Sequence, residues 1–219
     1  MKNIAFLLLI ASVFNTALAK IDESALKNLA PNLSENVLKM AINAVNCANQ
    51  EANKPIQNIS IIDYSLPSTK KRFWSFDVIN NKLLFHEFVA HGKNTGANYA
   101  KNFSNIPGSK QSSVGLFKTA GTYNGSNGYS LILNGLEKGF NDMALKRYIV
   151  MHGAAYVSQE FINKHGRLGR SWGCPAFEKK LAKTIIDKIK QDQFLFIYYP
   201  EDEWLKKSTY INCQKPHSL

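Results

Sequence analysis

The sequence predicts a mainly β fold, a sandwich or barrel with flanking helices. From residue 58 onward, short runs rich in β-branched and aromatic residues dominate the chain. Turn-forming residues separate these runs about every ten positions, as is typical of sandwiches and barrels. Apolar residues at helical spacing are concentrated toward the two ends of the chain, so helices are expected to flank the strands.

The first 19 residues predict a secretory signal peptide. Lys2 provides a positive start, residues 4–13 are almost wholly apolar, and Ala17-Leu18-Ala19 has the small-residue pattern of a cleavage site. The apolar stretch is too short to span a membrane, and no later segment reaches about 18 uninterrupted apolar residues. We therefore expect an exported protein, periplasmic or extracellular, without a membrane span.

Residues 20–55 are predicted to form a helical N-terminal segment. Between positions 22 and 51, apolar residues recur at the spacing of one helix face, and Pro55 ends the helical pattern. The residues that carry this spacing are Leu33, Val37, Met40, Ala41, Ala44, Val45 and Ala48.

Residues 56–200 are predicted to form one β-rich domain, followed by a polar tail over residues 201–219. Asn80-Asn81 separates two of the strand-like runs, which indicates a hairpin. Residues 92–113, rich in Gly, Asn and Ser, form a long connection, and connections of this length are usually functional or mobile. Strands are expected at 58–65, 72–79, 83–92, 113–120, 128–135, 147–153 and 193–199, and helices at 158–164 and 177–190.

The charge balance favours an anionic partner. The chain has 27 Lys and Arg residues against 16 Asp and Glu residues, a formal net charge of +11. In an exported protein such an excess favours an anionic polymer or surface, such as the cell wall. The basic residues are scattered rather than gathered in one aromatic-interleaved run, so a nucleic-acid partner is not expected.

The chain has three cysteines, which in an oxidising compartment leave one thiol free if two of them pair. Cys47 lies near the end of the helical segment and Cys213 in the tail, and we expect these two to form a disulfide. The alternative is three separate thiols. In either case Cys174 is the cysteine expected to remain a thiol.

Cys174 is the strongest candidate nucleophile. It lies in a Gly-Cys-Pro turn just before the expected helix at 177–190, and a helix N-terminus favours a thiolate and lowers the thiol pKa. Gly173 permits a tight backbone, and the amides of Gly173 and Cys174 are placed to stabilise an oxyanion. From this motif alone, an inert buried cysteine is equally compatible.

A base for this thiol is offered by His152, which ends an apolar strand-like run and is followed by Gly153. A lone histidine in such a place is more often structural, but a Gly-Cys turn about twenty residues later favours a catalytic pair. No ligand-pair spacing of His, Cys or acidic residues lies near the turn, so neither a metal nor another cofactor is expected.

The segments "MHGAAY" and "GRLGRSWGCPAF" resemble the signature of the murein L,D-transpeptidase (YkuD-like) catalytic domain family, and the similarity covers roughly residues 58–200. The resemblance implies a β-rich fold with the nucleophile in a cleft. It also implies that Cys174 is the nucleophile, that His152 activates it and that the Gly153 carbonyl orients the imidazole. Ser171 and Gly173 match the turn that carries the cysteine.

The resemblance further implies a reaction with peptidoglycan stem peptides. The thiolate attacks a tetrapeptide stem at its meso-diaminopimelate carbonyl, D-alanine leaves, and an amine acceptor takes the acyl group from the thioester. With water as acceptor, the chain is instead an L,D-carboxypeptidase or another peptidoglycan cysteine hydrolase. A non-catalytic cell-wall-binding protein is the remaining alternative. The sequence makes no prediction of the oligomeric state.

Two positions depart from the family pattern. Trp172 replaces the usual histidine, and Pro175-Ala176 replaces a pair in which many relatives have an arginine. An indole is able to stack on a substrate, and Arg170 or Arg167 is placed to meet a substrate carboxylate. The expected substrate-binding residues are Arg170, Trp172, Ser171 and His91, the last because His91-Gly92 ends a strand much as His152-Gly153 does.

Overall fold

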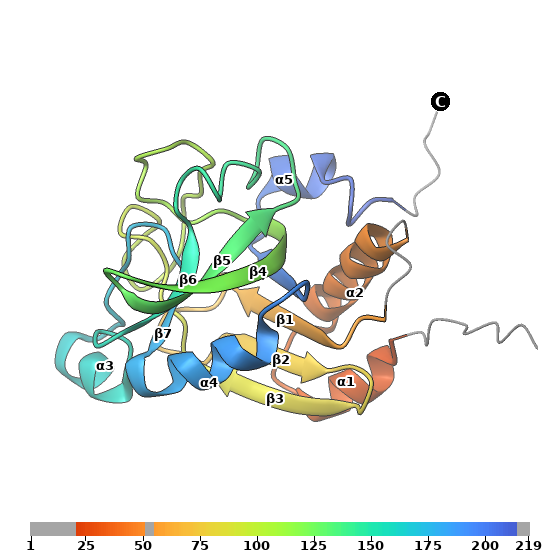
Figure 1. Cartoon of the computed structure of the whole chain (residues 1–219), viewed down its shortest axis with the longest axis horizontal. Helices are drawn as coiled ribbons and strands as arrows, with labels where there is room; N and C mark the ends of the chain where they lie inside the picture. The colour runs from red at the N-terminus through yellow and green to blue at the C-terminus, as the bar shows by residue number, and fades with distance from the viewer. Residues whose placement is uncertain (1–20, 51–54, 214–219) are drawn as a thin grey trace, which may run out of the picture.

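The computed structural model describes residues 21–50 and 55–213, and the predicted signal peptide lies outside them (Figure 1). One sheet of eight strands has the order β3-β2-β1-β8-β4-β5-β6-β7. Five helices accompany it in this part of the chain, so the mainly β class with flanking helices is confirmed. The strands are β1 (Asn58–Asp63), β2 (Phe73–Asp77), β3 (Lys82–Glu87), β4 (Gly115–Gly125), β5 (Gly128–Gly135), β6 (Val150–Ala154), β7 (Ala176–Glu178) and β8 (Phe194–Tyr198). The helices are α1 (Glu23–Leu29), α2 (Glu35–Asn49), α3 (Gln159–His165), α4 (Lys179–Ile189) and α5 (Asp202–Lys207).

Several boundaries differ from the sequence prediction: the strand expected at 83–92 ends at Glu87, so His91 lies beyond it, and the strand expected at 147–153 begins at Val150. The N-terminal helical segment is two helices, α1 and α2, and the polar tail contains α5. Strand β7 was not predicted, because its three residues directly precede α4 and merge with the apolar pattern of that helix. The expected helix at 177–190 therefore begins only at Lys179.

The sheet is a nearly closed barrel. Its edge strands in the pairing order are β3 and β7. Ala90, three residues beyond the end of β3, forms an antiparallel bridge with Ala176 of β7, and the Ala90 N–H donates to the Ala176 carbonyl at 2.8 Å. This bridge satisfies edge groups that an open sheet leaves unpaired. It also brings the segment after β3 to the strand that follows Cys174.

The central strands β1 and β8 are buried on both faces. They pair in parallel, and their side chains alternate between two clusters, as the two-residue period of a strand requires. Ile59 and Phe196 pack with α1, α2 and α5, whereas Ile62 and Ile197 pack with α4. Figure 1 shows α1 and α2 at one side of the sheet and α3 at the opposite end.

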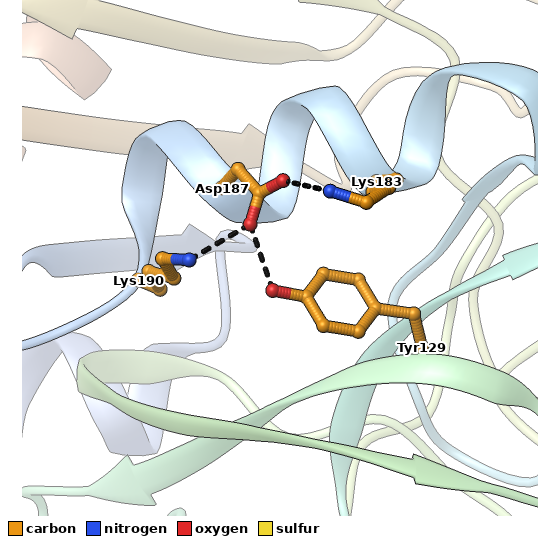
Figure 2. A network of polar contacts seen from close by, with 4 residues as sticks. All are labelled: Tyr129, Lys183, Asp187 and Lys190. Atoms are coloured by element: carbon orange, nitrogen blue, oxygen red, sulfur yellow. Dashed lines mark hydrogen bonds and ion pairs between the residues drawn. The ribbon is translucent and has the colours of Figure 1, made fainter.

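A polar network joins α4 to β5 (Figure 2). Asp187 of α4 accepts a hydrogen bond of 2.7 Å from the Tyr129 hydroxyl of β5 and forms ion pairs with Lys183 and Lys190. These partners hold the pKa of the Asp187 carboxyl well below its usual value, the hydrogen bond from Lys183 being the largest cause. The network keeps the helix that follows β7 fixed against the strand that neighbours β6.

Among the described helices, none is long and apolar enough to cross a membrane.

A disulfide joins Cys47, near the end of α2, to Cys213, after α5. Their Cα atoms are 6.3 Å apart and 166 positions separate them in sequence. The bond encloses all eight strands of the sheet in one covalent loop. Cys174 is the free cysteine, and it is buried.

We predict that Cys213→Ser lowers the free energy of unfolding by about 2–5 kcal/mol, because opening so long a loop restores entropy to the unfolded chain. Urea unfolding followed by tryptophan fluorescence measures this change. Cys174→Ser is the matched control, since it removes a sulfur without opening the loop. If adding dithiothreitol leaves the urea midpoint of the wild-type chain unchanged, the disulfide contributes no stability and the prediction is wrong.

Candidate active site

The turn that carries Cys174 is held by the segment after β3. Ser171 forms a parallel bridge with Gly92. The Ser171 N–H donates to the His91 carbonyl at 3.0 Å, and the Lys93 N–H donates to the Ser171 carbonyl at 2.7 Å. This pairing fixes the backbone three residues before Cys174.

Two glycines let the backbones meet at this turn. Gly173 has a φ of 125°, and a Cβ there would lie 2.8 Å from the Gln111 carbonyl oxygen. A Cβ on Gly92 would lie 2.9 Å from the Gly173 Cα and 2.6 Å from the Lys110 carbonyl oxygen. Gly173 is therefore required both by its backbone conformation and by the lack of space.

Ser112 connects the two glycines through its hydroxyl group. The Gly92 N–H donates to the hydroxyl at 3.0 Å, and the hydroxyl donates to the Gly173 carbonyl at 3.0 Å. Ser112 itself is buried, and its N–H donates to the Thr95 hydroxyl at 2.8 Å. The long connection over residues 92–113 is thus part of the wall around the cysteine.

The Cys174 side chain points into the core and is 9% exposed. The thiol donates to the Tyr148 carbonyl at 3.6 Å, and the Val150 N–H donates to the sulfur at 3.5 Å. Burial raises the pKa of the thiol, while the Val150 N–H and the positive charge of Arg147 oppose this rise. The resting cysteine is therefore a protonated thiol at neutral pH.

The expected helix N-terminus at Cys174 is absent, and the predicted lowering of the thiol pKa is wrong. Residues 176–178 extend as β7 beside β6, so helix α4 starts five residues after the cysteine. The dipole effect of a helix falls off within its first turn. Burial then decides the direction of the pKa shift.

The predicted pair of oxyanion donors is reduced to one. The Gly173 N–H donates to the Ser171 hydroxyl at 3.1 Å, and that hydroxyl donates to the Cys174 carbonyl at 2.6 Å. In the described part of the chain the Cys174 N–H has no partner. Ser171 is buried and occupied within the turn, which speaks against the substrate-binding role expected for it.

His152 lies on β6 and is placed beside the cysteine turn by strand register. It pairs with Ala176 of β7, two residues after Cys174, and its N–H donates to the Pro175 carbonyl at 3.3 Å. On the other side it pairs with Ser130 of β5. The parallel pairing of β6 with β7 thus brings His152 next to the turn that carries the thiol.

The His152 imidazole has the form of a base. Its Nδ1 lies 3.1 Å from the Gly153 carbonyl, which is able only to accept, so Nδ1 carries the proton and Nε2 is an acceptor. Burial lowers the pKa of His152, against a smaller rise from the Gly153 carbonyl, so the ring is neutral at pH 7. Within the described residues, neither Cys174 nor any other group is hydrogen-bonded to Nε2.

His91 has a different environment from His152. Its Nδ1 accepts from the Arg72 guanidinium at 2.8 Å, and its Nε2 lies 3.3 Å from the Gly96 carbonyl. Burial, and then the charge of Arg72, lower its pKa to about 3. With both ring nitrogens occupied and 1% of the residue exposed, His91 is not available to bind substrate, contrary to the expectation from sequence.

Trp172 and Arg170 lie on the outer side of the same turn. Trp172 is 74% exposed, with the Lys110 ammonium 4.9 Å from its ring centroid. The Arg170 Nη1 donates to the carbonyls of Lys93 and Gly96 at 3.2 and 3.1 Å, and its other nitrogens have no such bond in the described chain. Both side chains are placed to meet a ligand that approaches the turn from solvent.

Sequence reasoning missed two residues that are electrostatically coupled to Cys174. Arg147 opposes the rise of the thiol pKa, and Tyr156 has its own pKa raised to about 12 by burial and by the charge of an ionised Cys174. Arg147 lies outside both segments that carry the family resemblance, so only the tertiary structure relates it to Cys174. Tyr156 is the last residue of "MHGAAY", and that segment is the available sequence signal for it.

The described residues contain no group of three or more His, Cys, Asp or Glu side chains that would hold a metal ion. The arrangement is that of a thiol and a neutral imidazole, which is suited to acyl transfer through a covalent intermediate.

Comparisons with known proteins give a family for this chain. A model of the L,D-transpeptidase catalytic domain matches residues 29–198. Among curated proteins, no sequence match was found.

Several solved structures match part of this chain. An L,D-transpeptidase from Mycobacterium smegmatis is 10% identical, with 66% of this chain and 60% of that chain covered and a TM-score of 0.41. The helical cell shape determining protein Pgp2 from Campylobacter jejuni is 15% identical, with 66% and 49% covered and a TM-score of 0.41. An L,D-transpeptidase from Xylanimonas cellulosilytica is 14% identical, with 69% and 68% covered and a TM-score of 0.36. The chain thus spans less than two thirds of the first two proteins.

We predict that Gly173→Ala lowers the free energy of unfolding by about 3 kcal/mol, because it combines backbone strain with a clash against Gln111. Gly108→Ala is the matched control: Gly108 also has a positive φ, of 77°, but nothing lies within 4 Å of a Cβ placed there. Gly108→Ala is expected to lower the free energy of unfolding by about 1 kcal/mol, because it introduces backbone strain without a clash. Equal urea midpoints for the two variants would show that the close approach at Gly173 adds nothing to the loss of stability.

Proposed function

The chain belongs to the L,D-transpeptidase catalytic domain family, and from that premise we propose that it is an exported cysteine acyltransferase acting on peptidoglycan. The observation that carries this proposal is the pairing of β6 with β7. This pairing puts His152 opposite Ala176, two residues after the free thiol of Cys174, and the neutral imidazole has no hydrogen bond to Nε2 within the described residues, which supports the proposal.

The proposed first half-reaction makes a thioester. Nε2 of His152 takes the thiol proton as the sulfur attacks the meso-diaminopimelate carbonyl of a tetrapeptide stem. The Cys174 N–H is the donor available to the oxyanion. Collapse of the tetrahedral intermediate breaks the peptide bond, the proton passes from His152 to the departing amine, and D-alanine leaves.

In the second half-reaction an amine of another stem attacks the thioester. His152 accepts the proton of that amine, and the sulfur leaves and is reprotonated. The products are a new amide cross-link and the resting thiol. Water in place of the amine gives net carboxypeptidase cleavage.

The two pKa shifts decide how the proton moves. Burial raises the thiol pKa and lowers the His152 pKa. Both shifts favour the neutral thiol and the neutral imidazole over a preformed thiolate–imidazolium pair. Proton transfer is therefore expected to accompany attack, with His152 acting as a general base rather than as the resting partner of an ion pair.

Substrate recognition is assigned to the exposed side of the turn. Trp172 offers an indole face for stacking, and Arg170 offers guanidinium nitrogens for a stem carboxylate. The net charge of +11 favours approach to an anionic wall polymer.

Export is proposed from the leader at residues 1–19, and the disulfide between Cys47 and Cys213 supports it. Structural disulfides form and persist in oxidising compartments such as the periplasm or the cell exterior.

We predict that Cys174→Ala abolishes acyl transfer while leaving the fold intact. Mass spectrometry is expected to show about one carbapenem per wild-type chain, because a β-lactam carbonyl acylates a reactive thiol, and none on the variant. A muropeptide digest of sacculi treated with the wild-type chain is expected to show new 3-3 cross-links. New tetrapeptide-derived tripeptides without cross-links indicate water as acceptor. Binding to sacculi with no adduct and an unchanged digest would establish a non-catalytic wall-binding protein instead.

We predict that His152→Ala lowers the acylation rate by about 10²–10⁴-fold, the usual contribution of a general base. In the wild-type chain, activity is expected to fall on acidification only below the ordinary histidine pKa, because the pKa of His152 is lowered and its neutral form is the base. His86→Ala is the control, since His86 lies on β3 and bonds the Lys71 carbonyl. If His152→Ala is acylated at the wild-type rate, His152 is not the general base.

A further inference from the structure

Arg147 makes a set of contacts that the proposed reaction has not used. It lies in the turn before β6, and its guanidinium donates four hydrogen bonds to the connection over residues 92–113. Nη1 donates to the Ser104 carbonyl at 2.5 Å and the Ser113 hydroxyl at 2.6 Å. Nη2 donates to the Ser109 hydroxyl at 3.1 Å and the Gln111 carbonyl at 2.6 Å. One side chain thus clamps residues 104–113.

The clamped segment is the one that packs on the nucleophile turn. The Gln111 carbonyl, which Arg147 binds, is also the group that leaves no space for a Cβ on Gly173. The next residue, Ser112, donates to the Gly173 carbonyl. Releasing Arg147 therefore removes four of the hydrogen bonds that hold the segment covering the residue before Cys174, and the bonds of Ser112 remain.

The charge of Arg147 has no carboxylate partner in the described part of the chain. None of the six ion pairs there includes it, and its buried Nε has no hydrogen-bond partner. Burial lowers the Arg147 pKa, and the charge of an ionised Cys174 raises it again. Besides burial, the charge of an ionised Cys174 is therefore the influence on the Arg147 pKa in the described part of the chain.

The backbone beside Arg147 reaches the sulfur directly. Tyr148 has a φ of 55°, an uncommon conformation for a non-glycine residue, and its carbonyl accepts the Cys174 thiol at 3.6 Å. Val150 donates its N–H to the same sulfur. The other titratable groups electrostatically coupled to an ionised Cys174 are Tyr64 and Tyr156, both with raised pKa and therefore neutral. His152, on β6, is neutral as well.

We propose that Arg147 is a positioning residue for the nucleophile: its guanidinium holds residues 104–113 against Gly173 and presents the positive charge that faces the Cys174 thiolate. The proposal rests on the function proposed above only in taking Cys174 as the nucleophile. According to the proposal, both the ionisation of the Cys174 thiol and the position of residues 104–113 depend on the Arg147 side chain.

The test is the pH dependence of Cys174 alkylation by iodoacetamide, followed by mass spectrometry on the full chain with its disulfide intact. Arg147→Gln is expected to raise the apparent thiol pKa by about one unit, the lower end of the effect of a nearby opposite charge. Arg147→Lys keeps the charge and is expected to keep the wild-type pKa. Since Lys cannot make four bonds in a fork, its limiting rate at high pH is expected to rise several-fold as the segment opens. Lys146→Gln removes an exposed neighbouring charge and is expected to match the wild-type chain.

A wild-type apparent pKa in a folded Arg147→Gln chain overturns the proposal. If circular dichroism shows that Arg147→Gln does not fold, the test is made on Arg147→Lys. A limiting alkylation rate equal to that of the wild-type chain then contradicts the proposal that Arg147 holds residues 104–113. Alkylation requires no peptidoglycan, so these results hold even if no cross-link is formed. Conversely, if sacculi treated with the wild-type chain give an unchanged muropeptide digest, the proposed acyltransferase activity is rejected, and the proposed role of Arg147 at the thiol is not affected.

Discussion

The site depends on one backbone contact, the close approach of Gly92, Ser112 and Gly173. The two ends of the connection over residues 92–113 meet the turn before Cys174 so closely that a single methyl group would separate them. Because Gly92 belongs to the segment that closes the sheet and Gly173 precedes the thiol, closing the barrel and placing the nucleophile are the same event. The β6–β7 pairing then needs only three residues to set His152 beside the turn.

Much of the fold could be predicted from sequence, because strands such as β1 and β8 are short runs rich in β-branched or aromatic residues with clear boundaries. The short β7 could not be predicted, because three residues after a proline are too few to show the two-residue alternation of a strand. Without β7, the helix was expected to begin next to Cys174, and the thiol pKa was expected to be lowered rather than raised. The two His-Gly pairs look alike in sequence. Tertiary partners distinguish them: Arg72 donates to one ring nitrogen of His91, whereas Nε2 of His152 has no hydrogen bond among the residues that the structure describes.

The site separates chemistry from recognition. The groups assigned to bond making and proton transfer are buried and neutral at rest, and the cation coupled to an ionised Cys174 in the described part of the chain is Arg147. The residues assigned to recognition, Trp172 and Arg170, lie on the solvent side of the same turn. Burial keeps water from the thiol, and it also makes ionisation costly, so the surrounding donors rather than solvent determine when the sulfur becomes an anion.

The burial of Cys174 has a further consequence, for thiol–disulfide exchange. A chain with three cysteines has three possible pairings, and a thiolate at position 174 is able to attack the Cys47–Cys213 bond and scramble it. In the folded protein this sulfur is enclosed in the core with a raised pKa, so both its access and its thiolate fraction are suppressed. The same enclosure that restrains the nucleophile therefore preserves the correct pairing of the other two cysteines.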